Sequence, residues 1–91
     1  MADNALRPAD TIPLPQEIRT SGGRVRAAVR TVTEGLRLID QDLPIELRGL
    51  PRWTFAKALL QEAARTRSKR DVATAARQLR QALDNEGWLA Q

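Results

Sequence analysis

The stretch SKRDVATAARQLRQALDNEG, residues 68–87, decides the fold because it carries the signals of one complete amphipathic helix. At its start, Ser68 and Asp71 have the spacing of a capping box, in which the hydroxyl accepts a hydrogen bond from a backbone amide of the first turn. Apolar residues then recur every three or four positions, so they share one face of the helix. This face consists of Val72, Ala75, Ala76, Leu79, Ala82 and Leu83.

The end of this helix is marked as clearly as its start. Gly87 follows the last polar turn, and glycine readily adopts the left-handed backbone conformation that commonly terminates a helix. We therefore expect the helix to run to about Glu86. Trp88 occupies the position at which a Schellman motif makes its hydrophobic contact, so we expect its ring to pack against Leu83.

A second helix is predicted over residues 52–66. Pro51 precedes it and suits the first turn of a helix, where its missing N–H is not needed. Alanine is frequent in the segment and favours helix strongly. The larger apolar residues and two alanines fill one continuous arc of a helical wheel: Trp53, Phe55, Ala56, Leu59, Leu60 and Ala63.

A third helix begins at Thr31, because Thr31 and Glu34 again have capping-box spacing. We expect it to stop before Pro44, since a residue that precedes proline is pushed out of the helical conformation. Its apolar stripe consists of Val32, Leu36, Ile39 and Leu43. The connector that follows, residues 43–51, is too short and too interrupted by proline to form a long helix.

Residues 16–20 and 24–30 predict a β-hairpin, because they flank Ser21-Gly22-Gly23, a stretch suited to a tight turn. In the second arm, Val25, Ala27 and Val29 alternate with arginines and are predicted to share one face. Residues 1–13 are expected to form a disordered tail ahead of a single small domain, residues 14–91. The predicted fold class is α+β and mostly helical: an N-terminal β-hairpin followed by three α-helices.

A family resemblance emerges from this order of elements. A short hairpin, a helix that ends in Leu43-Pro44, a helix rich in alanine and leucine, and a final helix containing Ala76-Arg77 and Leu79 together resemble domain-of-unknown-function family 982, a family of small alphaproteobacterial proteins. The resemblance implies a small α+β domain. It carries no known activity and therefore transfers no functional residue to this chain.

The composition argues against an enzyme. The 91 residues include no histidine and no cysteine, which excludes the common nucleophile–base pairs, thiol chemistry and the usual zinc sites. The carboxylates form no pair with an evident division between acid and base, so we expect no cofactor, metal or small-molecule substrate. No apolar run approaches the roughly 20 residues of a membrane span, and the lack of cysteine fits a reducing compartment, so we expect a cytoplasmic protein.

The charge predicts a possible nucleic-acid surface. Fifteen basic and eleven acidic residues give a net charge of +4. Basic residues gather before and along the last helix, where they could follow a phosphate backbone: Arg65, Arg67, Lys69, Arg70, Arg77 and Arg80. An arginine-bearing face that only keeps the protein soluble is the alternative interpretation. A basic ribbon formed by Arg24, Arg26 and Arg30 is a further alternative.

The connector predicts a second candidate surface. Ile45, Leu47, Leu50 and Trp53, together with Leu43, supply more large apolar side chains than a solvated loop should hold. They either seal the end of the core or form a protein-contact patch with Trp53 as its anchor. We expect a non-enzymatic interaction module that acts through self-association, such as a homodimer, or through a protein partner. Nucleic-acid binding through the last helix is the alternative.

Overall fold

The computed structural model describes residues 12–21 and 25–90, and it confirms an α+β, mostly helical fold that begins with a two-stranded antiparallel hairpin. In chain order the elements are β1 (Pro13–Arg19), β2 (Ala28–Thr31), α1 (Val32–Arg37), the π-helical segment η2 (Leu38–Asp42), α2 (Ile45–Arg48), α3 (Pro51–Thr66) and α4 (Lys69–Asn85).

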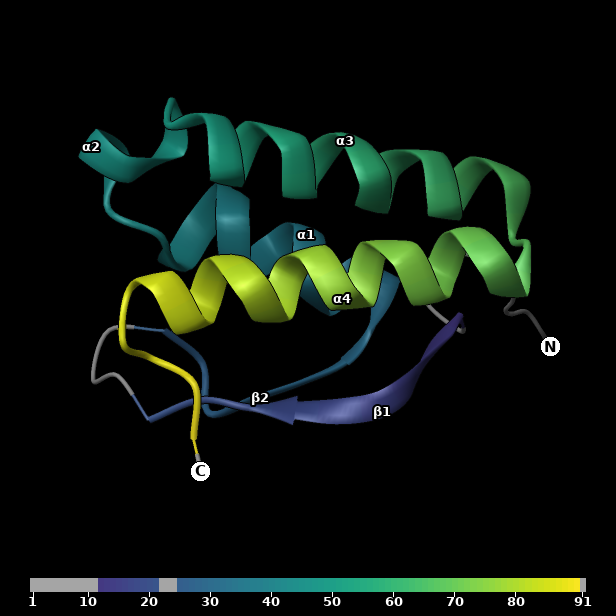
Figure 1. Ribbon diagram of the computed structural model, residues 1–91, viewed down its shortest axis with the longest axis horizontal. Helices are drawn as coiled ribbons and strands as arrows, with labels where there is room; N and C mark the ends of the chain where they lie inside the picture. The colour runs from purple at the N-terminus through teal and green to yellow at the C-terminus, as the bar shows by residue number, and fades with distance from the viewer. Residues whose placement is uncertain (1–11, 22–24, 91) are drawn as a thin grey trace, which may run out of the picture.

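The helices α3 and α4 lie antiparallel, and the hairpin lies on the side of α4 that faces away from α3 (Figure 1). The helix α1 lies behind α4 in this view and contacts both α3 and β2. One hydrophobic core runs between these elements, and its largest fully buried side chains include Trp53, Leu60, Leu79 and Leu83. Because α4 contacts both α3 and β1, its apolar face ties the helical pair to the hairpin.

The local signals of α4 are confirmed at both ends. The Ser68 hydroxyl accepts a hydrogen bond from the Asp71 amide at 3.1 Å, and all six residues of the predicted apolar face are buried. Gly87 has φ of +77°, the Trp88 amide donates to the Leu83 carbonyl at 2.9 Å, and the Gly87 amide donates to the Asp84 carbonyl at 2.9 Å. These two bonds define a Schellman motif. Trp88 is half-buried and packs against the core.

The predicted cap of α1 is present, but the helix does not continue in α-helical form. Thr31 accepts a hydrogen bond from the Glu34 amide at 3.1 Å, while the Glu34 carboxylate accepts one from the Arg30 amide at 2.7 Å. In η2 the Leu43 amide donates to the Leu38 carbonyl five residues earlier, at 2.9 Å. Leu38, the first residue of η2, is buried, a position that the expected stripe omitted.

Gly35 allows α1 to approach the pair of long helices closely. A Cβ atom at this position would lie 3.2 Å from the methyl groups of Leu60 on α3 and 3.3 Å from a methyl group of Leu79 on α4. These distances are tighter than ordinary van der Waals contacts. The missing side chain of Gly35 therefore sets the spacing at the centre of the core, where three helices meet.

The hairpin differs from its expected form in its second arm. The register pairs Ile18 with Val29 and Arg19 with Ala28, and β2 begins only at Ala28. Val25 and Val29 are buried as expected, but Ala27 is exposed, so the strict alternation predicted for this arm is wrong. The expected glycine turn at residues 22–23 lies outside the described residues.

The body of the domain starts earlier than expected at its N-terminus. Ile12 is buried, and its carbonyl accepts a hydrogen bond from the Val32 amide at 3.1 Å. The start expected at Leu14 is therefore too late by at least two residues, because Ile12 and Pro13 already pair with the end of β2 and the start of α1. Residues 1–11 of the expected tail lie outside the described residues.

The C-terminal segment adds a short third partner to the sheet. The Ser21 amide donates to the Trp88 carbonyl at 2.7 Å, and the Ala90 amide donates to the Arg19 carbonyl at 2.9 Å. An antiparallel bridge between Thr20 and Leu89 lies between these two bonds. The sharp reversal at Gly87 thus directs the chain end onto the edge of β1.

Replacing Gly87 with alanine should lower the free energy of unfolding by about 1–2 kcal/mol, because an L-residue is penalised at positive φ. Gly49 provides the matched control. It caps α2 with an ordinary φ of −89° and has open space around its missing Cβ, so Gly49→Ala should be neutral or slightly stabilising. Urea denaturation followed by circular dichroism measures the free energy of unfolding of both variants. Equal effects of the two substitutions would contradict a left-handed conformation at Gly87.

Candidate interaction surfaces

Trp53 belongs to the core rather than to an exposed patch. Its side chain is fully buried, and its Nε1 donates a hydrogen bond to Oε2 of Glu86 at 3.0 Å. Arg52 Nε donates to the same carboxylate oxygen at 3.2 Å. A buried indole N–H requires an acceptor, and Glu86 at the end of α4 supplies it. The interpretation of Trp53 as a surface anchor is therefore wrong.

The other predicted connector residues do not share one environment either. Leu43 is buried, while Leu47 and Leu50 are half-buried and pack against the core. Ile45 alone points outward, with 75% of its surface exposed. Most of the connector therefore seals the end of the core around Trp53, and Ile45 remains as a candidate contact residue.

Phe55, which was predicted to face inward, is the second large exposed hydrophobic residue. Burial of Trp53, Ala56 and Leu60 fixes the rotation of α3, and at 100° per residue this places Phe55 roughly 120° from the centre of the buried face. Its side chain is 53% exposed. Ile45 is the first residue of α2 and Phe55 the fifth residue of α3. These two helices adjoin at one end of the molecule (Figure 1).

The basic residues of α4 form an exposed face, as expected. Within residues 12–21 and 25–90, no carboxylate lies within ion-pair distance of these side chains. They occupy a sector of about 100° on the helix, and the centre of this sector lies roughly 130° from the centre of the buried face. We call this sector the basic face; it consists of Lys69, Arg70, Arg77 and Arg80.

The two arginines that precede α4 have different roles. Arg65 pairs with the Glu62 carboxylate, one turn earlier in α3, through two guanidinium nitrogens. Arg67 is exposed and caps the C-terminus of α3 in the left-handed conformation, with φ of +58°. The paired Arg65 is less available to an anionic partner than the four residues of the basic face.

The basic ribbon proposed for the hairpin does not form as a free surface. Arg26 binds Asp42 at the end of η2 through its backbone amide at 3.1 Å, its Nε at 2.6 Å and a terminal nitrogen at 3.1 Å. Arg30 pairs with Glu17 on β1 at 3.3 Å. Arg24 lies outside the described residues. Arg26 and Arg30 thus form ion pairs with other elements of the fold. No local sequence pattern indicated these two pairs.

The Arg26–Asp42 contact changes the acidity of both groups. The guanidinium hydrogen bonds hold the pKa of the Asp42 carboxyl below its usual value, and the carboxylate raises the pKa of Arg26. The two side chains are 29% and 19% exposed, so water screens the pair only in part. The contact attaches the loop before β2 to the end of η2.

Other acidic residues also have structural partners. Asp40 binds Lys57 of α3 at 2.8 Å, and Asp71 accepts a hydrogen bond from the Thr66 hydroxyl at 2.6 Å across the turn between the two long helices.

In the part of the chain that the structure describes, no group of three acidic side chains is arranged to hold a metal ion. No helix there has both the length and the apolar character to cross a membrane.

No protein-family model, curated protein or solved structure matches this chain. The resemblance to domain-of-unknown-function family 982 stays a prediction that depends on Leu43-Pro44 and on the spacing within α4. The candidate surfaces must therefore be judged on their geometry.

Replacing Asp42 with asparagine should lower the free energy of unfolding by about 1–2 kcal/mol at neutral pH, because it removes a charge-assisted, bidentate contact. The folded pKa of Asp42 lies below its unfolded value. Its stabilisation is therefore fully present above about pH 4 and is lost as the pH falls through the folded pKa.

Urea denaturation across this pH range should show that the deficit of Asp42→Asn shrinks as the solution becomes more acidic. Asp84→Asn serves as the control, because Asp84 is exposed and pairs with no described basic residue. A deficit that did not change with pH would show that lost packing, rather than the charge, accounts for the effect.

Proposed function

We propose that this chain is a non-enzymatic interaction module that associates with a second copy of itself through the end formed by α2 and the start of α3. One observation carries the proposal: Ile45 and Phe55 are the two large hydrophobic side chains that the described residues leave exposed, at 75% and 53%. Single exposed hydrophobic residues are common, but two of them on adjoining helices at one end of a folded 91-residue molecule favour a contact surface.

The polar side chains around this end support the proposal because they are already held in place. Arg48 Nε donates to the Leu43 carbonyl at 2.9 Å, and Arg52 is held by Glu86. A rigid rim reduces the entropy lost on association. Full burial of the two hydrophobic side chains would contribute about 1.5–3 kcal/mol each, which is the range of an interface hot spot.

A second copy of the chain is the partner that we favour. A domain of this size buries only about 60–65% of its unfolded surface, so association is a natural source of further stability. In a dimer with two-fold symmetry, the two exposed side chains of one copy meet the same two of the other, and no separate complementary surface is required. The proposal assumes a cytoplasmic protein, an expectation that rests on the absence of cysteine.

The double substitution Ile45→Ser and Phe55→Ser should shift the protein from dimer to monomer, because it removes most of the apolar area at the contact. Sedimentation velocity over a range of protein concentrations measures the change, and circular dichroism checks that the helices remain folded. The control is Gln61→Ser with Gln81→Ser, two exposed positions on α3 and α4. A wild-type protein that stays monomeric at all concentrations would contradict self-association.

Nucleic-acid binding is the second candidate, and the unpaired basic face of α4 favours it. Contacts to phosphates by Lys69, Arg70, Arg77 and Arg80 would release counterions, so the affinity would fall steeply with salt. The face has few side chains suited to reading base edges, which restricts it to binding with little sequence preference.

If this candidate is correct, Arg70→Gln, Arg77→Gln and Arg80→Gln together should weaken binding to any duplex. The slope of log affinity against log salt should fall by up to about three units, near 0.9 per lost phosphate contact. Fluorescence anisotropy with a labelled duplex measures this. Arg65→Gln is the control, since Arg65 is paired with Glu62. Our preferred proposal instead predicts no duplex binding tighter than about 100 μM at physiological salt.

A further inference from the structure

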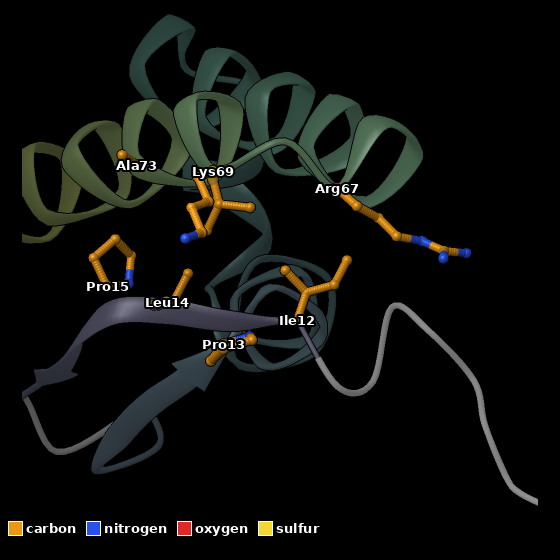
Figure 2. Close-up of a pocket in the computed structure, with 8 residues that line it drawn as sticks. Ile12, Pro13, Leu14, Pro15, Arg67, Lys69 and Ala73 are labelled. Carbon is orange, nitrogen blue, oxygen red and sulfur yellow. The ribbon is translucent and has the colours of Figure 1, made fainter.

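A separate apolar groove lies between the start of β1 and the start of α4 (Figure 2). Neither Ile45 nor Phe55 lines it. The groove is open to solvent on one side and has a volume of about 600 Å³, which is within the range of small-molecule binding sites. Its walls are almost entirely apolar. The side chains that form them are Ile12, Leu14 and Pro15 from the β1 side, and Val72 and Ala73 from α4.

One cation is directed across this groove. Figure 2 shows Lys69 reaching from α4 toward β1, whereas Arg67 points away into solvent. Within residues 12–21 and 25–90, no carboxylate pairs with Lys69. The groove therefore combines an apolar floor with the charge of Lys69, which is directed across it, and the charge of Arg67 at its rim.

The edge of β1 beside the groove is poorly suited to a protein strand. Pro13 and Pro15 have no backbone N–H, so this part of β1 cannot donate the hydrogen bonds by which an added strand is held. An occupant of the groove must then be held by apolar contact and by the charge of Lys69. An unbranched apolar chain that ends in an anionic group has both properties.

We propose that this groove binds a free fatty acid of medium length, with its alkyl chain between Leu14 and Val72 and its carboxylate beside the ammonium group of Lys69. A chain of roughly ten carbons fits within the volume of the groove. The charge of the head group then determines which amphiphile is preferred. This proposal does not depend on self-association, because the two sites share no residue.

Titration of the full chain with decanoate, below the concentration at which it forms micelles, tests the proposal. Amide shifts in nitrogen–proton correlation spectra should concentrate at Leu14, Val72 and Ala73. Decyltrimethylammonium has the same chain with a positive head group, and it should bind about tenfold more weakly, as expected for one charge interaction at a partly exposed site.

Lys69→Gln should remove the preference for the anionic head group while leaving the alkyl chain able to bind. Ala73→Phe, which fills the groove, should abolish binding of both amphiphiles with the helices intact by circular dichroism. Arg80→Gln is the matched control, because it removes a cation from the same helix outside the groove. Equal binding of the two amphiphiles, shifts centred away from β1 and α4, or no binding of decanoate would each overturn the proposal.

Discussion

The contact between the buried indole of Trp53 and the carboxylate of Glu86 is the constraint on which the rest of the structure depends. It joins the first turn of α3 to the residue that caps α4, more than thirty positions later in the chain. Because a buried N–H without an acceptor is costly, the hydrogen bond to Glu86 favours the observed rotation of α3 against α4. That rotation directs Ala56 and Leu60 inward and leaves Phe55 in solvent.

This constraint also separates the surfaces of the molecule. The end formed by α2 and the start of α3 keeps Ile45 and Phe55 exposed, while Leu47 and Leu50 pack against the core. The apolar face of α4 packs against α3 and β1. Its remaining circumference carries the basic face, which forms no ion pair with any carboxylate of residues 12–21 and 25–90. The groove lies between the start of α4 and the proline-containing strand β1 (Figure 2). A small domain therefore carries an exposed apolar pair, a basic face and an apolar groove, and Lys69 belongs to both the basic face and the groove.

Those features of the fold that depend on neighbouring residues could be predicted from the sequence. The cap at Ser68, the buried stripe of α4 and the reversal at Gly87 all follow from side chains within a few positions of one another. The π-helical turn of η2 could not be predicted in the same way, because it departs from the 3.6-residue period on which the expected helix was based. The pairing of Leu89 with Thr20 joins the segment after α4 to the residue that follows β1, and no local pattern indicates it.

For the candidate surfaces too, only features set by neighbouring residues could be predicted from the sequence. Exposure of the cations along α4 follows from its strong amphipathic period, and the sequence predicted it. The outward position of Phe55 and the inward position of Trp53 could not be separated on a wheel, since apolar residues cover a wide arc of α3. The partner of Arg26 could not be predicted from the sequence either, because Asp42 belongs to a different element, sixteen positions away. Tertiary contacts, rather than propensity, determine these three positions.

Fluorescence of the single-tryptophan variant Trp88→Phe tests most directly whether Trp53 is part of the core, the claim from which the choice of Ile45 and Phe55 as contact residues follows. The account predicts emission typical of a buried indole, little quenching by acrylamide, and a shift of the spectrum when Glu86 is also replaced with alanine. Emission and quenching typical of an indole in water would contradict the account, because Trp53 would then be free to act at the surface.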